Sequence, residues 1–315
     1  MQLEEFLEQS ALRIPDKIAL VVGERKWSYS DIDGLSNQFA ATLASQGVKR
    51  RDRVVVCVEN SAEMCVAIFA VLKLGAVFVP IHPSTKAGKL IYILKDSGAR
   101  CLIIDYERIR DLKSIPETCV EAIVPRTDVP TSIGESSGKI PGPPRTGIDM
   151  DLAALIYTSG STGTPKGVML SHLNMISAAT SITTYLENTP DDVILNVLPM
   201  SFDYGLYQLL MAFKVGATLV LEKGFAFPAA ALNLIARKRV TGFPIIPTIS
   251  AILLQMDLTR WDLSSLRYLT NTGAALPVNH IVKLREVLPH ARIYSMYGLT
   301  ECKRVSYLPP DQIDV

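Results

Sequence analysis

Residues 155–167 carry the sequence Leu155-Ile156-Tyr157-Thr158-Ser159-Gly160-Ser161-Thr162-Gly163-Thr164-Pro165-Lys166-Gly167. The first three residues end a predicted buried strand, and glycines, hydroxyl side chains and one lysine follow. Glycine lets backbone N–H groups come close to an anion, hydroxyl groups add donors, and lysine supplies a positive charge. The stretch therefore predicts a loop that binds a polyphosphate.

This loop differs from the Walker A loop of P-loop NTPases. Pro165 stands where that loop has its second glycine, and Gly167 follows Lys166 in place of Ser or Thr. The alternative of a flexible Ser/Thr/Gly linker is disfavoured, because the loop lies between one apolar run and another at 168–170. A phosphate loop of a different class is the better interpretation.

On both sides of the loop, apolar strand patterns alternate with helical patterns. Strands are predicted at 53–58, 76–81, 101–105, 153–157, 193–197, 217–221, 242–246, 266–271 and 292–295. Helices are predicted between most of them, and an earlier helix is expected to begin at Ser30, with Asp33 as the reach-back residue, and to end at Gly47. This alternation predicts an α/β fold with two doubly wound, mainly parallel sheets flanked by helices.

The same pattern suggests a division of the chain. We expect a subdomain A at about 48–185, which includes the phosphate loop at 158–167, and a subdomain B formed by about 1–47 and 186–315. The Pro-, Gly- and Ser-rich stretch at 125–147 is expected to be a long surface loop.

Composition excludes several classes of partner. The 315 residues include 32 basic and 31 acidic ones, so a net charge of +1 gives no bulk attraction to nucleic acid or an anionic membrane. The longest apolar run, 65–81, is interrupted by Lys73 and Gly75, so no transmembrane segment is predicted. The acidic N-terminus does not resemble a secretion signal, and we expect a cytoplasmic protein. Five cysteines without Cys-x-x-Cys spacing indicate neither a disulfide framework nor a zinc site.

The run from Leu155 to Asn174 resembles the signature loop of the adenylate-forming superfamily, which comprises acyl-CoA synthetases, peptide-synthetase adenylation domains and luciferases. Further pieces occur in the family's order at 74–80, 198–203, 271–277 and 297–301, so the resemblance covers essentially the whole chain. It implies ATP-dependent activation of a carboxylic acid as an acyl-adenylate, with release of pyrophosphate.

The resemblance also implies roles for individual residues. The β- and γ-phosphates would be held by Thr158, Ser159, Gly160, Ser161, Thr162, Gly163, Thr164 and Lys166. The adenine would lie against Gly273, Ala274, Ala275, Tyr297 and Gly298. Thr300 would contact the α-phosphate and Glu301 would bind Mg²⁺, which makes Lys166, Thr300 and Glu301 the catalytic set. Such cations and donors offset the repulsion between an attacking carboxylate and a phosphate.

The acid pocket implied by the resemblance has mixed chemistry. Its members would be Phe202, Asp203, Tyr204, Tyr207, Thr248, Asn271, Thr272 and Cys302. The Phe-Asp pair is typical of amino-acid adenylation domains, in which Asp203 would pair with an amine, but Lys303 is an alternative partner. A third possibility is that Asp203 only caps the following helix.

Residues 301–304, Glu-Cys-Lys-Arg, resemble AMP-forming acyl-CoA ligases associated with bacterial exosortase systems. We therefore expect an acyl-CoA ligase of the kind found in fatty acid metabolism, with CoA as the cosubstrate. The alternatives are an adenylation domain that loads carrier-protein pantetheine, a non-catalytic nucleotide-binding protein, and a luciferase-like oxygenase.

In the family, the N-terminal domain continues with a small β-barrel and an aspartate that binds the ribose, and a mobile C-terminal domain brings a catalytic lysine. The resemblance therefore implies that these 315 residues are a partial adenylation domain that is inactive or impaired alone.

His172 is expected to be a first-turn helix residue after the cap Ser171.

Overall fold

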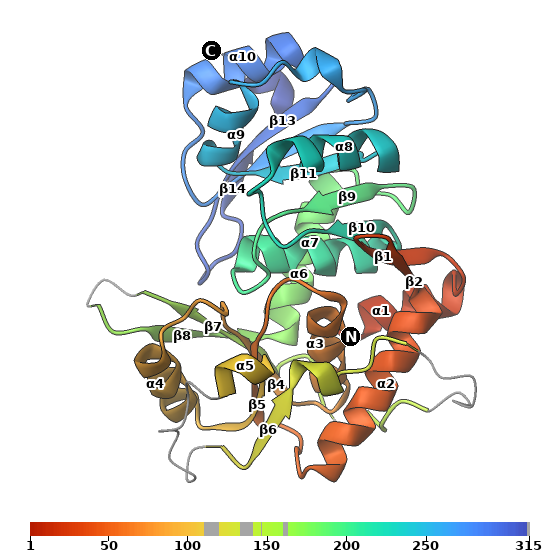
Figure 1. The fold of residues 1–315 in the computed structure, drawn as a ribbon, viewed down its shortest axis with the longest axis vertical. Coiled ribbons are helices and arrows are strands. Elements are labelled where there is room, and N and C mark those ends of the chain that lie inside the picture. Colours follow the sequence, from red (N-terminus) through yellow and green to blue (C-terminus); the bar gives the residue numbers. More distant parts are fainter. Residues whose placement is uncertain (110–119, 133–140, 146, 160–162, 314–315) are drawn as a thin grey trace.

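The computed structural model describes residues 1–109, 120–132, 141–145, 147–159 and 163–313. Within them, a six-stranded sheet and an eight-stranded sheet are flanked by helices (Figure 1). Most neighbouring strands in both sheets run parallel, which confirms the predicted fold class. None of the described helices is long and apolar enough to cross a membrane.

The six-stranded sheet contains the strand that leads into the phosphate loop. In spatial order its strands are β6 (Ala122–Pro125), β5 (Ala99–Ile104), β3 (Arg53–Cys57), β4 (Val77–Pro80), β7 (Leu152–Thr158) and β8 (Lys166–Ser171). Only the edge strand β8 runs antiparallel to its neighbour. The helices in this part of the chain are α3 (Ala62–Lys73), α4 (Ala87–Ser97), α5 (Tyr106–Ile109) and α6 (His172–Tyr185).

The eight-stranded sheet combines the start and the end of the chain. Its order is β14 (Ser306–Leu308), β13 (Arg292–Tyr297), β12 (Tyr268–Asn271), β11 (Gly242–Ile245), β9 (Val193–Asn196), β10 (Thr218–Leu221), β1 (Ile18–Val22) and β2 (Arg25–Ser28). The remaining helices are α1 (Glu5–Arg13), α2 (Tyr29–Ser45), α7 (Asp203–Val215), α8 (Pro228–Lys238), α9 (Pro247–Leu253) and α10 (Val278–Val287). Short 3₁₀ turns lie at Arg126–Asp128, Leu258–Arg260 and Pro310–Gln312.

The start of α2 corrects the predicted cap. Ser28, not Ser30, is the N-cap residue, and Asp31, not Asp33, reaches back to its backbone N–H at 2.8 Å. Ser28 is extended because it ends strand β2, so its hydroxyl is free to accept from the N–H of Asp31. Ser30 already lies in the first helical turn.

A buried lysine joins three helices in the core. The Lys73 side chain is only 2% exposed, and its ammonium contacts Asp33 at 2.6 Å and Asn37 at 2.5 Å, both on α2. Glu8 of α1 lies 3.5 Å away. Because an isolated buried charge is costly, these partners are what makes a lysine tolerable at the end of α3.

A second buried polar pair lies between α1 and the start of α6. His172 follows the cap Ser171, as predicted, and its Nδ1 accepts the backbone N–H of Leu3 at 3.0 Å. Burial lowers the pKa of His172 to about 4 and raises the pKa of the neighbouring Glu4 to about 7. The Glu4 carboxyl is therefore a proton-binding group of the folded state at mildly acidic pH.

We predict that Glu4→Gln stabilises the protein at about pH 8 and has little effect at about pH 4. Glu4 releases its proton near pH 4.5 when unfolded and near pH 7 when folded, so its contribution to stability is complete below pH 4.5 and is lost as pH rises to 7. The pKa shift corresponds to a loss of about 3 kcal/mol in the free energy of unfolding above pH 7, and the neutral amide of Gln would avoid this loss. Urea denaturation at both pH values measures it, and the exposed Glu24→Gln is the control. An equal effect of Glu4→Gln at both pH values would contradict the prediction.

Candidate functional site

The predicted phosphate loop is the tip of the β7–β8 hairpin. Thr158 and Lys166 are partners across the two antiparallel strands. Gly160, Ser161 and Thr162 lie outside the described residues. Ser159, Gly163, Thr164 and Lys166 are exposed. Gly163 has φ +81°, a left-handed conformation that favours glycine, so the turn back to β8 depends on this residue.

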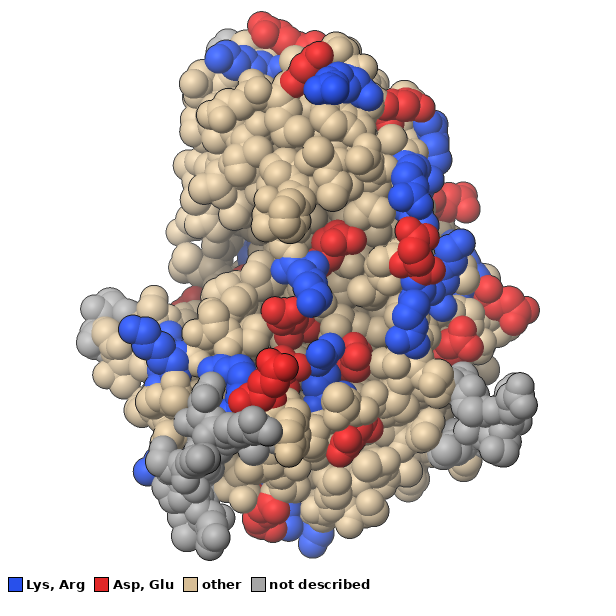
Figure 2. All heavy atoms as spheres, viewed as in Figure 1, with Lys and Arg blue, Asp and Glu red and all other residues tan. Residues whose placement is uncertain are grey.

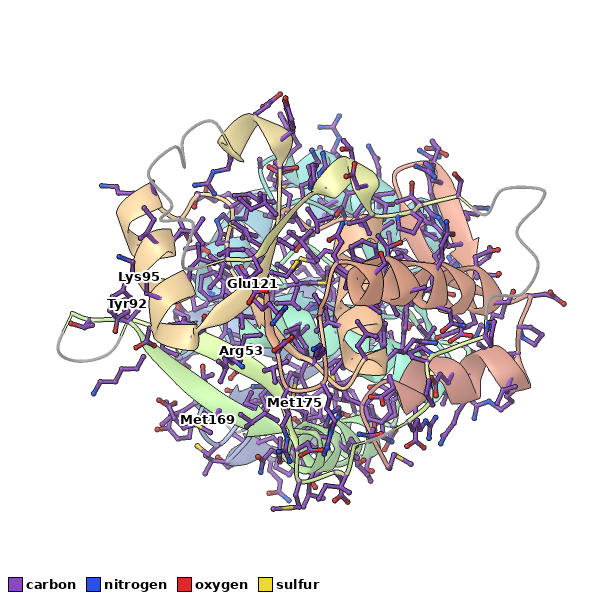
Figure 3. The ribbon with its side chains drawn as sticks, turned by 90° about the horizontal axis from the view of Figure 1, so that it is seen from below. Arg53, Tyr92, Lys95, Glu121, Met169 and Met175 are labelled. Carbon is purple, nitrogen blue, oxygen red and sulfur yellow. The ribbon has the colours of Figure 1, made fainter. Side chains whose placement is uncertain are left out.

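Helix α4 supports this hairpin from one side, as the position of Tyr92 in Figure 3 shows. The Tyr157 hydroxyl donates to Asp96 Oδ2 at 2.6 Å, and the Tyr92 hydroxyl donates to the carbonyl of Pro165 at 3.3 Å. The Tyr157 ring lies so close to Gly167 that a Cβ there would be 3.1 Å from it. These supports were not predicted, because nothing in the local sequence links residues about 60 positions apart.

The proposed adenine-binding residues follow two neighbouring parallel strands. Residues 273–275 come after β12 and Tyr297 ends β13, so both groups lie at the carboxyl edge of the eight-stranded sheet. Residues 273–275 are exposed, and the Tyr297 side chain is 59% exposed. The fold therefore brings these two segments together with open faces, as a flat ligand requires.

A turn at 298–305 connects β13 to β14, and it carries Thr300 and Glu301. Its base is closed by the N–H of Val305, which donates to the carbonyl of Tyr297 at 3.0 Å. A Cβ on Gly298 would lie 2.0 Å from the carbonyl oxygen of Lys303, so only glycine fits there. Glu301 is exposed and Thr300 is half-buried.

The predicted acid-pocket residues come from the same sheet edge. Phe202 and Asp203 follow β9, Thr248 follows β11, and Asn271 ends β12. Phe202 is 55% exposed, whereas Tyr204 and Tyr207 are buried beneath it in α7. The Tyr204 hydroxyl lies 2.8 Å from both the carbonyl and the side-chain oxygen of Thr270.

Asp203 forms an ion pair and does not cap α7. Phe202 is the N-cap residue and makes no side-chain capping bond, so the capping interpretation of Asp203 is wrong. Lys303 Nζ lies 2.7 Å from Asp203 Oδ2 and 4.1 Å from the centre of the Tyr207 ring. Burial lowers the pKa of Lys303 to about 7, although Asp203 opposes this shift. The lysine is therefore the cation that makes this carboxylate tolerable.

Two buried hydroxyls in segments at this sheet edge have no partner within the described residues. They are Ser201 Oγ and Thr272 Oγ1, on residues that are 7% and 3% exposed. Ser201 also lines a cavity of 140 Å³ together with Asn60, His82 and Pro199. Because buried polar atoms are normally hydrogen-bonded, both hydroxyls are candidates for ligand contact. Thr272 was predicted and Ser201 was not, although it stands in a motif that the sequence singled out.

The two parts of the candidate site open on the same side of the molecule. In Figure 1 the turn between β13 and β14 hangs down from the upper part of the molecule toward the β7–β8 hairpin, which projects at the left. On the face in Figure 2, basic and acidic residues are interspersed and no field of one sign covers the surface.

Comparisons with known proteins agree with the fold. One subunit of the mycosubtilin synthase of Bacillus subtilis is 32% identical over 313 residues, which cover 95% of this chain. A structure of VinN in complex with L-aspartate has 30% identity and a TM-score of 0.83, covering 99% of this chain and 79% of VinN. The anthranilate CoA ligase AuaEII, bound to anthranoyl-AMP, has 27% identity and a TM-score of 0.87, with 100% and 62% coverage.

The chain spans 12% of the length of this mycosubtilin synthase polypeptide. The family model described as "AMP-binding enzyme" matches residues 7–314, which is nearly the whole sequence. Together with the fold, these matches show that the chain belongs to the AMP-binding family of adenylate-forming enzymes.

Proposed function

We propose that the protein adenylates a small carboxylic acid that bears an amino group and passes it to a pantetheine thiol on a carrier protein. The observation that carries the proposal is the placement of Asp203 at the sheet edge, beside the exposed Phe202. Lys303 occupies only Oδ2 of this carboxylate, and within the described residues Oδ1 accepts no hydrogen bond. That oxygen can accept from a substrate ammonium.

The unpartnered hydroxyls of Ser201 and Thr272 support a polar substrate, because a purely apolar acyl chain would leave both unsatisfied. The structure of VinN in complex with L-aspartate supports the same choice, because a similar protein is there bound to an amino acid.

The family implies the use of ATP, and the described residues suit that use. Thr158, Ser159 and Lys166 would hold the phosphates at the β7–β8 tip, and residues 273–275 with Tyr297 would face the adenine. No cluster of three metal-binding side chains occurs in the part of the chain that the structure describes. Mg²⁺ accepts a single carboxylate plus phosphate oxygens and water, so the exposed Glu301 would be sufficient. When bound, Mg²⁺ would neutralise charge on the phosphates.

An acyl-CoA ligase is the second candidate, and a specific contact favours it. The ion pair at 2.7 Å satisfies Asp203 without any substrate amine. An acid such as an aryl or fatty acid would then pack on Phe202 and the neighbouring backbone, and CoA would accept the acyl group. The anthranilate CoA ligase AuaEII supports this alternative.

Pyrophosphate exchange by the complete protein, including the lid domain that the family implies, with a panel of acids separates the two candidates. We expect the strongest exchange with amino acids, and weak exchange with analogues in which hydrogen replaces the amino group. Deletion of one charged hydrogen bond corresponds to about a 10- to 100-fold loss. Exchange only with fatty or aryl acids, followed by thioester formation with CoA, would reject the amino-acid proposal in favour of the ligase.

Lys166→Ala should raise the KM for ATP in this exchange by about 10- to 100-fold, because a charge-assisted contact to the phosphates is lost. The KM for the acid should change little. Lys95→Ala, which removes an exposed lysine from the adjacent helix α4, is the matched control. Equal behaviour of the two variants would remove Lys166 from the site.

Glu301→Gln should raise the Mg²⁺ concentration needed for half-maximal exchange by at least about tenfold. The amide keeps the shape of the side chain but loses the charge that attracts the cation. A magnesium titration at saturating ATP and acid measures the change, and Glu286→Gln on α10 is the control. An unchanged titration curve would show that Glu301 is not the metal ligand.

A further inference from the structure

The 298–305 turn has one buried residue, and it is a lysine. Lys303 is 6% exposed, whereas its neighbours Cys302 and Val305 are exposed. Its backbone has φ +31°, a left-handed conformation that is unfavourable for a residue with a side chain. A strained backbone persists only where surrounding contacts hold it. The contacts of Lys303 therefore determine the shape of this turn.

The ion pair and the ring contact of the Lys303 side chain both lead to the first two turns of α7, as does the ring contact of Arg304. Lys303 Nζ binds Asp203 and lies over the Tyr207 ring, and the Arg304 guanidinium lies 5.3 Å from the centre of the Tyr204 ring. Two consecutive cations thus hold three residues at the start of one helix.

The start of α7 is itself rigid. Tyr204 and Tyr207 are 7% and 1% exposed, and the Tyr204 hydroxyl is fixed to Thr270 in β12. A Cβ on Gly205 would lie 2.4 Å from the carbonyl of Pro199, so the helix packs directly on the preceding backbone. A side chain that binds this helix is held in a defined position.

We propose that Lys303 is a positioning residue: its ion pair with Asp203 fixes the 298–305 turn on α7 and thereby places Thr300 and Glu301 for their contacts with the nucleotide and its metal ion. The roles of Thr300 and Glu301 rest on the proposed function. The geometric part, the statement that Lys303 orders the turn, rests only on the contacts described above. Only Oδ2 of the carboxylate holds the turn, and within the described residues Oδ1 accepts no hydrogen bond.

Amide hydrogen exchange of the ligand-free protein tests the geometric part without any activity. In Lys303→Met, we expect the amides of 299–305 to exchange about tenfold faster or more, with no change in α10. Lys303→Arg should retain most of the protection, because it keeps the charge. Lys283→Met, an exposed lysine on α10, is the matched control. Unchanged exchange in the turn of Lys303→Met would overturn the proposal.

Kinetics then separate positioning from substrate binding. Lys303→Met should raise the KM for magnesium-bound ATP and lower kcat, while the KM for the acid stays within about twofold of the native value. Asp203→Asn should raise the KM for ATP and the KM for the acid, because it also removes the carboxylate proposed to bind the substrate. An increase in the acid KM alone in Lys303→Met would show that the lysine binds substrate instead. If Lys303→Met does not fold, the same amide-exchange measurement on Asp203→Asn and Lys303→Arg tests the proposal. The amides of 299–305 should then exchange faster in Asp203→Asn and stay protected in Lys303→Arg. If no acid supports exchange by the complete protein, including the lid domain that the family implies, the proposed function fails while the hydrogen-exchange result still stands.

Discussion

The candidate site depends on one constraint of parallel sheets: the carboxyl ends of neighbouring strands meet at the same edge. Strands β9, β11, β12 and β13 run parallel, so the segments that follow them gather although the sequence separates them by up to about 100 residues. Exposed polar and aromatic residues can stand in these segments because the apolar strands beneath are buried. The sheet thus gathers these segments at one edge, where direct contacts such as the Lys303–Asp203 ion pair can join them.

Much of this arrangement could be predicted from the sequence, because it is encoded locally. The apolar run at 153–157 predicted the strand β7, and the alternating pattern predicted two mainly parallel sheets. The return strand β8 was not among the predicted strands. Strands β1 and β2 were not predicted from the sequence. The cap of α2 was placed two residues late, because Ser28 and Ser30 offer the same chemistry and only the end of β2 distinguishes them.

The interactions that could not be predicted are those between distant residues. Nothing in the sequence shows that Asp96 supports Tyr157, or that Ser201 lacks a partner within the described residues. The pairing of Asp203 with Lys303 was one of three possibilities, and the structure excludes the helix-cap alternative by placing Phe202 at the cap. Which partner such a side chain takes is decided by burial and distance in the folded protein. Both depend on packing between residues that are about 100 positions apart in the sequence.

The pairing of β1 with β10 has a consequence for how the chain acquires its structure. Leu20 is the partner of Leu219, so a strand near the start must find one almost 200 residues later. At translation rates of about 5–20 residues per second, the β1–β2 hairpin would be finished about 10–40 s before its neighbour exists. During that time β1 is an apolar strand with an unpaired edge, a template for association with other chains. Assembly of the eight-stranded sheet is thus a late step in biosynthesis, and a period in which a chaperone could protect β1.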